Sequence, residues 1–461
     1  MNILHYSLGL PPYRTGGLTK YSFDLMKGQA RNGDKVYLLF PGTISVIKDK
    51  TRIKYYKNEY GINTYEIINP LPVPLLHGIS EPQKFMEACN KIVFENFLIE
   101  KEIQIVHIHT LMGLHKEFLE ACSDLNIKKV YTTHDYFGLC TKVNYIDNEG
   151  ALCEERNLEK CLRCNKLGYS SRTIMMLQSP VYRFLKNKGI VSKLKPLARK
   201  IKRGNNNISS SECKVEVKIT QEYKNSYNKL IEYYNDMFNY IDTFLFNSTI
   251  SQKVYNQYIK ANGEIISITH GDIKDNRKIK TYDNSKLKLT YLGPDKKYKG
   301  FNLLIDTMKE LNKEYKSDVE LNLYGDISER ELDDNINIHG RYSYDQLSYI
   351  FDNTDLLIVP SIWNETFGFI TLEALSFGVP VLITSKVGSK DIVCNDKLRK
   401  GIITKEDKFQ IRNKIIEIIN DRQILININK TIVDDNFEVS MYDHYKKIDA
   451  FYKNVLGECS Q

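Results

Sequence analysis

Two glutamates within residues 355–393 have a spacing that suggests chemistry, in the run DLLIVPSIWNETFGFITLEALSFGVPVLITSKVGSKDIV. Glu365 and Glu373 are eight positions apart, which corresponds to about 12 Å along a helix. Paired glycosidase carboxylates lie closer, about 5–9.5 Å apart. The spacing instead suits two contacts with one elongated ligand, such as the hexose and the ribose of a nucleotide sugar. The alternative is an ordinary strand–helix–strand unit with surface glutamates.

The residues around these glutamates predict a strand, a polar loop and a helix. The strand runs from Leu356 to Val359 and ends at Pro360. We expect the helix to open at Thr366–Gly368, with the amides of Thr366, Phe367 and Gly368 at the positive end of the helix dipole. Such amides can hold a phosphate between the two glutamates.

Histidines stand where two further predicted strands end. In HIHT, His107 and His109 are two positions apart on a strand and therefore face the same side. We expect His109, nearer the carboxyl end, to reach a ligand, and His134-Asp135 to add a polar pair after the next strand. The alternative for a lone strand histidine is a hydrogen-bonded core residue.

A lysine and two glycines complete the candidate residues. In YLGPDKKYKGF, Lys299 and Gly300 precede a helical pattern, so Lys299 can meet a diphosphate as a compact charge. The alternative is a solvated lysine cluster. Gly16-Gly17 follows the first strand and allows close backbone approach, although a plain turn is an equal possibility. The chain contains no Asp-X-Asp, so we expect Lys299 and helix amides, rather than a metal ion, to neutralise the diphosphate.

Apolar runs that alternate with helical periodicity indicate an α/β fold with two doubly wound, Rossmann-like domains facing each other across a cleft. We expect an acceptor-side domain over 1–264 with a Cys-rich and basic insertion at about 138–235, a linker over 265–285, a second domain over 286–440 and a final helix within 441–461 that packs back on the first domain. The predicted strands are Ile3–Tyr6, Val36–Phe40, Ile105–Ile108, Val130–Thr133, Thr243–Phe246, Leu287–Leu292, Val319–Tyr324, Ile336–His339, Leu356–Val359 and Val381–Thr384.

Composition excludes several classes of protein. The 461 residues suffice for two large domains, and 42% hydrophobic with 26% charged residues is ordinary for a soluble protein. The net charge of +8 is modest, so we expect no nucleic-acid partner. The start MNILHYSLGL has no basic region or long apolar run, and no stretch reaches the length of a membrane span. We therefore expect a cytoplasmic location, where structural disulfides are rare.

Four of the nine cysteines fall within 25 residues: Cys140, Cys153, Cys161 and Cys164. The close pair Cys161-x2-Cys164 is typical of thiolate zinc sites, so a structural zinc is one prediction. The wide gaps to the other two fit no standard ribbon, and four unligated thiols are the alternative.

The segment after these cysteines is basic. Thirteen Lys and Arg lie between Lys160 and Arg203, and no Asp or Glu occurs from Lys160 through Ser211. Apolar residues are interleaved, which favours short amphipathic helices on an anionic membrane surface. The alternative is a solvated basic insertion that covers the first domain. The basic group that we expect to matter most is Arg199, Lys200, Lys202 and Arg203.

Together these motifs resemble the retaining glycosyltransferases of classification family 4, the glycosyl transferases group 1, which have the GT-B fold. The resemblance rests on Gly16-Gly17, HIHT, TTHDYFGLC, FNSTIS, THGD, LGPDKKYKGFNLLI, LYGD, HGRYS and above all ETFGFITLE, which matches the family's E-x7-E motif. It implies that Glu365 contacts the donor sugar, Glu373 the ribose and Lys299 the diphosphate. His109 would lie beside the reacting carbon. The remaining residues with an expected role are Gly16, Gly17, Gly293, Lys297, Gly325, Thr366, Phe367 and Gly368 for the donor, and His134 and Asp135 for the acceptor.

Two departures from the family pattern stand out. Pro294 occupies a position where many members have an arginine, and Lys296 or Lys297 is the expected substitute. Ile327 stands where the second glycine of a Gly-X-Gly loop is usual.

The resemblance implies transfer of a hexose-type sugar from a UDP- or GDP-sugar to a saccharide or lipid-linked acceptor, with retention of configuration and without a catalytic cofactor. Capsule, exopolysaccharide, lipopolysaccharide or cell-wall glycan assembly is the expected setting, and a peripheral position on the inner membrane face is a further expectation. The alternatives are a non-catalytic GT-B partner subunit, which would be expected to lose Glu365, Glu373 or Lys299, and a sugar-nucleotide epimerase, whose carboxylate-rich first-domain site is not evident.

Overall fold

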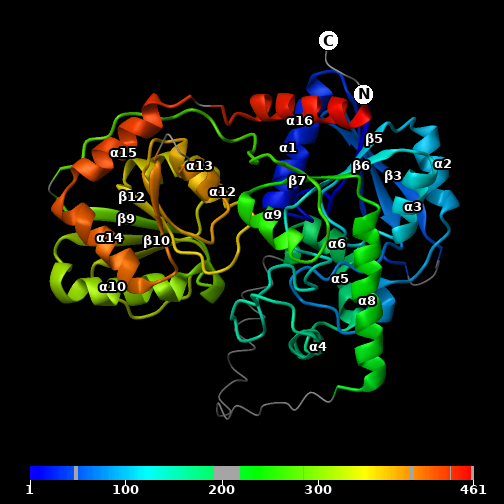
Figure 1. Cartoon of the computed structure of the whole chain (residues 1–461), viewed down its shortest axis with the longest axis horizontal. Coiled ribbons are helices and arrows are strands. Elements are labelled where there is room, and N and C mark those ends of the chain that lie inside the picture. The colour runs from blue at the N-terminus through cyan, green and yellow to red at the C-terminus, as the bar shows by residue number, and fades with distance from the viewer. Residues whose placement is uncertain (46–49, 192–218, 284, 395–398, 437, 458–461) are drawn as a thin grey trace. The chain divides into compact units, whose positions relative to one another are not determined.

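The computed structural model describes residues 1–45, 50–191, 219–283, 285–394, 399–436 and 438–457. The chain forms two compact units, each with its own core (Figure 1). The first unit contains Met1–Val143, Glu155–Phe244 and the chain from Ala450 onward, and the second contains Asn144–Glu154 and Leu245–Asp449.

The first sheet has eight strands in the order β3-β4-β2-β1-β5-β6-β7-β8. The central strands pair in parallel, and β3 pairs antiparallel with β4 at one edge. The strands are β1 (Asn2–Tyr6), β2 (Lys35–Pro41), β3 (Arg52–Glu59), β4 (Ile62–Ile68), β5 (Ile105–Ile108), β6 (Lys128–Thr132), β7 (Thr243–Phe246) and β8 (Gly263–Ile265).

Helices join these strands, and several have a side-chain cap at their N-terminus. Thr220 caps one helix by accepting a hydrogen bond from the amide of Tyr223, and Ser248 forms a capping box with Ser251 at another. The helical segments are α1 (Gly17–Arg31), η1 (Pro82–Phe85), α2 (Ile92–Glu100), α3 (Lys116–Asp124), α4 (Leu158–Lys166), α5 (Ser171–Leu177), α6 (Pro180–Asn187), α8 (Gln221–Asn239), α9 (Thr249–Asn256) and α16 (Met441–Leu456).

The second sheet has six strands, in the order β11-β10-β9-β12-β13-β14, and all neighbours pair in parallel. Its strands are β9 (Leu287–Leu292), β10 (Val319–Tyr324), β11 (Ile336–Gly340), β12 (Leu356–Val359), β13 (Val381–Thr384) and β14 (Gly401–Thr404). Its helical segments are η2 (Lys297–Lys299), α10 (Phe301–Tyr315), η3 (Tyr344–Gln346), α11 (Leu347–Asp352), α12 (Phe369–Leu375), α13 (Lys390–Val393), α14 (Lys408–Asn420) and α15 (Gln423–Asp434).

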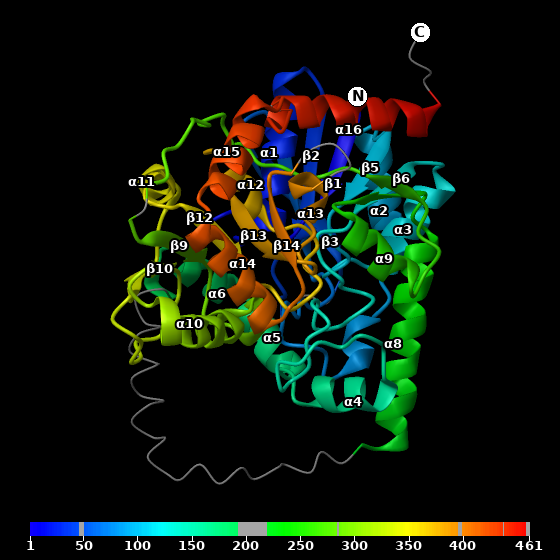
Figure 2. The ribbon, with the colours of Figure 1, turned by 60° about the vertical axis from the view of Figure 1, so that its left-hand side comes forward.

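Helices cover both faces of the second sheet. Because side chains alternate along a strand, Leu356 and Ile358 of β12 join the core under α10 and α14, whereas Leu357 joins the core under α11 and α12. Figures 1 and 2 both show α10 and α14 side by side on one face of this sheet. The unit is therefore doubly wound, as the alternating sequence pattern predicts.

The part of the last helix from Ala450 onward belongs to the first unit. Tyr452 of α16 is fully buried, and its hydroxyl contacts His107 of β5. Among the described residues, no helix combines the length and the apolar character that crossing a bilayer requires.

Candidate functional site

A close backbone contact in the second unit places Lys299 against Glu365. Gly300 has φ 75°, and a Cβ at this position would lie 1.7 Å from the carbonyl oxygen of Pro360. Only glycine therefore lets α10 begin directly against the loop after β12. The contact brings Lys299 Nζ to 2.5 Å from Glu365 Oε1. This ion pair uses one of the three N–H donors of the ammonium group.

The second carboxylate oxygen of Glu365 is available to a ligand. Glu365 Oε2 is buried without a hydrogen-bond partner, and so is the hydroxyl of Ser389. Both lie next to Gly368, because a Cβ there would be 3.6 Å from Glu365 Cδ and 3.5 Å from Ser389 Oγ. A buried polar atom without a partner is costly, so this pair indicates a place for a ligand with hydroxyl groups. We call Lys299, Glu365, Gly368 and Ser389 the glutamate pocket.

The backbone of this pocket refines one prediction. Gly368, which has φ 99°, is the N-cap of α12, so the helix opens at the last residue of the predicted Thr366–Gly368 stretch, and Thr366 and Phe367 lie in the loop before it. The carbonyl of Thr366 accepts a hydrogen bond from the Ser248 hydroxyl at 2.7 Å, and that of Phe367 accepts one from the Ser389 amide at 2.7 Å. These bonds hold the segment as a loop against neighbouring elements.

This start of α12 also removes the geometric basis for the expected separation of the two glutamates. Glu365 lies in the loop, where it forms an isolated parallel bridge with Val387, and only Glu373 lies in α12. A rise per helical residue therefore does not describe the path from Glu365 to Glu373.

Glu373 is held by a histidine that the sequence patterns did not single out as a site residue. The carboxylate is 4% exposed, and its Oε1 lies 3.2 Å from His270 Nε2. The amide of Asp272 donates to His270 Nδ1 at 3.3 Å, so the proton of a neutral His270 is on Nε2 and points at Glu373. Burial and the nearby Glu373 charge raise the pKa of Tyr344, so this hydroxyl stays protonated. Glu373 is thus a fixed, buried hydrogen-bond acceptor.

Two glycines pack the loops after β9 and β10 together. Gly325 has φ 143°, and a Cβ there would lie 2.0 Å from the carbonyl oxygen of Gly293. The amide of Gly293 in turn donates to the carbonyl of Tyr324 at 2.9 Å. Both expected glycines therefore permit close packing of these two loops.

An arginine reaches the loop that carries Pro294, although it comes from a different part of the chain. Arg330 bonds Asp295 at 2.7 Å, and its guanidinium lies 4.8 Å from the ring centroid of Phe301. Lys297 instead lies 3.5 Å from the carbonyl oxygen of Glu149. No local signal in the sequence connects Arg330 with Asp295, because 35 positions separate them.

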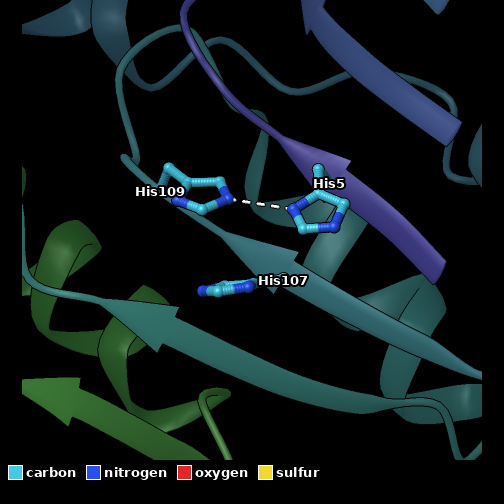
Figure 3. Close-up of side chains that lie close together, drawn as sticks. All are labelled: His5, His107 and His109. Carbon is cyan, nitrogen blue, oxygen red and sulfur yellow. Dashed lines mark hydrogen bonds between the residues drawn. The ribbon is translucent and has the colours of Figure 1, made fainter. Parts of the chain in front are cut away.

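Four histidines lie together in the first unit: His5, His107, His109 and His134 (the histidine cluster; three are drawn in Figure 3). Strands β1 and β5 pair with His5 opposite His107. His109 lies two positions beyond His107 on the same face, and its amide donates to the carbonyl of Tyr6 at 2.9 Å. His5, from the first strand, was not among the expected site residues.

Hydrogen bonds give the cluster a fixed polarity. His5 Nε2 lies 2.7 Å from Gln29 Oε1, His5 Nδ1 lies 3.0 Å from His109 Nε2, and His109 Nδ1 lies 3.0 Å from His134 Nε2. The Gln29 carbonyl can only accept, so a neutral His5 carries its proton on Nε2 and accepts at Nδ1. His109 and His134 are then also protonated on Nε2, and Nδ1 of His134 is left as an acceptor.

Burial keeps two of these rings neutral. It lowers the pKa of His5 to about 4, and it lowers the pKa of His109 well below its usual range, with His107, His134 and His5 adding to the effect. Burial also raises the pKa of Asp135, which follows His134, to about 7, although the Phe137 amide opposes this by donating to it at 2.9 Å. The acceptor-side pair therefore includes a carboxyl group that can exchange a proton near neutral pH.

A metal ion does not fit the histidine cluster as it stands. One ring nitrogen from each of His5, His107 and His109 lies within 4.8 Å of the others. However, both nitrogens of all three rings already have partners; those of His107 are Tyr452 at 2.5 Å and Thr132 at 2.6 Å. An ion would have to break the bond between His5 and His109.

The other expected residues lie as follows. Gly16 caps α1 with φ 124° and Gly17 is the first residue of that helix. A Cβ added at Gly16 would meet no atom within 4 Å, so its backbone is open to approach.

The cysteines are divided between the units. Cys140, Cys161 and Cys164 belong to the first unit and Cys153 to the second, and all four are partly buried. The pKa of Tyr227 is raised by burial and by Cys161 and Cys140, so these two thiols lie near the same hydroxyl. The structural zinc remains a prediction.

Comparison with known proteins identifies the second unit. Residues 272–453 match the family model of the glycosyl transferases group 1. An uncharacterized glycosyltransferase of Methanocaldococcus jannaschii is 24% identical over 239 residues, which are 48% of this chain and 66% of that protein. An uncharacterized 41.2 kDa protein in the cps region of Klebsiella pneumoniae is 29% identical over 140 residues, 30% of this chain and 37% of that protein. The matches thus span less than two thirds of each relative.

Solved structures show the fold of the whole chain. Sucrose-phosphate synthase of Thermosynechococcus elongatus has a TM-score of 0.57 at 13% identity, covering 99% of both chains. HepE of Anabaena in complex with UDP has a TM-score of 0.58 at 13% identity, covering 98% of this chain and 100% of its own. WaaG, a glycosyltransferase involved in lipopolysaccharide biosynthesis, has a TM-score of 0.53 at 12% identity, and the match covers 97% of this chain and 99% of WaaG. The fold is GT-B, as the sequence predicts.

Proposed function

We propose that this chain, whose residues 272–453 match the family model of the glycosyl transferases group 1, transfers a hexose-type sugar from a nucleoside diphosphate sugar to a saccharide or lipid-linked acceptor. The observation that carries the proposal is the glutamate pocket. A lysine with two remaining N–H donors stands beside a buried carboxylate oxygen that has no partner. A nucleotide sugar has a diphosphate that the lysine can bind and sugar hydroxyls that can donate to the carboxylate oxygen.

In this proposal the second unit holds the donor. Lys299 and nearby amides bind the diphosphate, Glu365 accepts from the hydroxyls of the sugar, and Glu373 accepts from the ribose. His270 orients Glu373 because it donates to one oxygen of this carboxylate. Arg330 is an additional cation on the Pro294 loop. HepE was crystallised with UDP and with UDP-glucose, which makes a UDP-sugar the first donor to test.

The chemistry we propose needs no protein nucleophile. The bond between the anomeric carbon and the diphosphate breaks while the acceptor hydroxyl attacks from the same face, and the leaving phosphate takes the hydroxyl proton. This retains the configuration. Lys299 stabilises the charge that develops on the leaving group. A neutral His109 suits a position beside the cationic sugar, because an imidazolium there would repel it.

Transfer by the purified protein tests the function. We expect one of the UDP- or GDP-sugars to be consumed with release of the nucleoside diphosphate, and a thermal-shift screen with UDP, GDP, ADP and CMP to identify the base. Lack of nucleotide binding, together with lack of turnover of every donor, would contradict the proposal.

We further propose that the acceptor is presented at an anionic membrane surface. The insertion exposes apolar side chains next to basic ones: α6 has no buried residue, and Val181 and Phe184 are 68% and 60% exposed. Leu167, Tyr169, Met176 and Ile190 are further exposed apolar residues of the insertion. The basic group at Arg199, Lys200, Lys202 and Arg203 lies outside the described residues. Apolar and basic side chains on one segment favour an anionic bilayer.

Vesicle sedimentation tests this surface. The full-length protein should bind phosphatidylglycerol-containing vesicles more than phosphatidylcholine vesicles, and added salt should weaken the binding. The double variant Val181→Asp with Phe184→Asp should lose binding, whereas Tyr349→Asp, which changes an equally exposed apolar residue of the second unit, should not. Equal binding by both variants would mean that α6 is not the membrane contact.

A further inference from the structure

A buried arginine in the first unit has no anionic partner within the described part of the chain. Arg14 lies in the loop before α1, two residues ahead of Gly16, and is only 8% exposed. Its Nε is buried without a hydrogen-bond partner. The nearest polar contact of its guanidinium is a long one, 3.5 Å from the hydroxyl of Tyr13. No carboxylate among the described residues bonds to this guanidinium.

The surroundings of Arg14 are aromatic and basic rather than acidic. Its guanidinium lies 4.5 Å from the ring centroid of Tyr13, and Lys186 of α6 lies 5.4 Å from the same centroid. Burial lowers the pKa of Arg14, and the groups that oppose this are the hydroxyls of Tyr13 and Tyr182. Arg183 of α6 is also close enough to lower the pKa of Tyr13, but it has its own partner in Glu66.

Such an arrangement is unfavourable in a protein without a ligand. A buried charge without a partner destabilises the folded state by several kcal/mol, whereas an apolar side chain of similar size is tolerated there. A guanidinium also has a planar fork of donors that matches the oxygens of a phosphate. The guanidinium lies over the Tyr13 ring in a cation–π contact, but the ring face supplies no hydrogen-bond acceptor for the N–H groups of Arg14.

We propose that Arg14 binds a phosphate group of the acceptor substrate, a lipid diphosphate, with Lys186 as a second cation. This inference rests on the proposed glycosyl transfer. The choice of a lipid rests on α6, because this helix supplies Lys186 beside Tyr13 and also exposes Val181 and Phe184. One element thus carries both a cation for a phosphate and an apolar surface for an isoprenoid chain. A phosphate of the donor nucleotide has the same chemistry and is the other source that an experiment must separate.

Calorimetric titration of the full-length protein with farnesyl diphosphate, with farnesol and with UDP separates these sources. In Arg14→Met we expect affinity for farnesyl diphosphate to fall about 10- to 100-fold, the effect of losing hydrogen bonds to a charged group. Affinity for UDP should not change in this variant, and farnesol should bind both proteins equally. In Glu373→Ala, affinity for UDP should fall and affinity for farnesyl diphosphate should not change. Failure of the donor assignment can then be told from failure of the Arg14 assignment.

Stability provides an independent readout. Without any ligand, Arg14→Met and Arg14→Gln should melt at or above the temperature of the wild type, because the substitution removes an uncompensated buried charge. Arg172→Met, which changes an exposed arginine of the same insertion, is the matched control and should alter neither binding nor melting. Unchanged affinity for farnesyl diphosphate in both Arg14 variants would overturn the proposal. A loss of UDP affinity alone would overturn the acceptor assignment and give the phosphate to the donor.

Discussion

The glutamate pocket of the second unit is partly buried and the histidine cluster of the first contains the fully buried His5, His107 and His109, and the two regions differ in charge. Lys299 and Glu365 form an ion pair, and Glu373 is a carboxylate oriented by His270. In the histidine cluster, burial keeps His5 and His109 neutral. The first arrangement can bind a charged ligand. The second can only present dipoles of fixed direction, which suits a group that becomes cationic during the reaction.

The largest effect should come from the ion pair. Lys299→Met or Glu365→Gln should lower turnover about 100-fold or more, because each removes a charge that acts on the reacting groups. The double variant should lose less than the product of the two single effects, since the residues share one bond. Steady-state rates of donor consumption provide the measurement, with Lys309→Met, an exposed lysine of α10, as the control. Rates near wild type in both single variants would show that this pair is not the reacting centre.

Glu373 provides the next prediction. Glu373→Ala should weaken nucleotide binding about 10- to 100-fold, because it removes a buried charged acceptor for the ribose hydroxyls. Calorimetric titration with the nucleotide checks this, and His270→Gln should give a smaller loss, since it only removes the group that orients Glu373. An unchanged dissociation constant in Glu373→Ala would separate this carboxylate from the nucleotide.

The comparison between the two regions also shows what the sequence could predict. Ten strands were predicted and all ten are present, because each is a short apolar run. Four strands were missed: β3, β4, β8 and β14. β3 reads RIKYYKNE and is largely exposed at the sheet edge, β8 has three exposed residues, and β14 has four residues. Lys299 and Glu365 were both expected at carboxyl ends of strands, and the structure shows them in contact.

The histidine cluster was harder to predict, because its partners come from distant parts of the chain. His5, Gln29 and Tyr452 belong to β1, α1 and α16, and only pairing of β1 with β5 brings His5 beside His107. The one available signal was a lone polar residue inside the apolar run NILHY. The position of Gly368 was visible in the sequence, but its φ of 99°, which delays the start of α12, depends on the packing of Glu365 and Ser389 around it.

The neutrality of the histidine cluster gives a pH prediction. The pKa of His5 is about 4 in the folded protein and about 6.5 when unfolded, so its contribution to stability is complete above pH 6.5 and is lost as the pH falls towards 4. Between pH 7 and pH 4.5 this loss is about 2 kcal/mol. Asp135 has the opposite sign, because its pKa is raised to about 7, so its ionisation opposes folding as the pH rises.

Comparison of wild type with His5→Asn separates the contribution of His5 to the pH dependence of stability from that of Asp135. Chemical denaturation at the two pH values should show a smaller acid-induced loss of stability in the variant. A matching loss in both proteins would mean that His5 titrates normally in the folded state. Nitrogen-15 spectra of labelled histidines should also show His109 protonated on Nε2 in the wild type and a mixture of tautomers in Gln29→Leu.

The smallest expected effect is that of a chelator. We expect turnover to be unchanged by EDTA, because the sequence has no Asp-X-Asp and Lys299 is placed to neutralise the diphosphate. Activity that EDTA abolishes and magnesium or manganese restores would show instead that a metal ion holds the diphosphate.

The division of roles between the two regions is the central claim, and nucleotide affinity in a histidine variant tests it most directly. In His109→Asn, calorimetric titration should give a dissociation constant for the donor nucleotide within about 2-fold of wild type, while turnover falls about 10-fold or more. Glu373→Ala, titrated alongside, should lose affinity. A fall in nucleotide affinity in His109→Asn as large as the fall in Glu373→Ala would contradict the account.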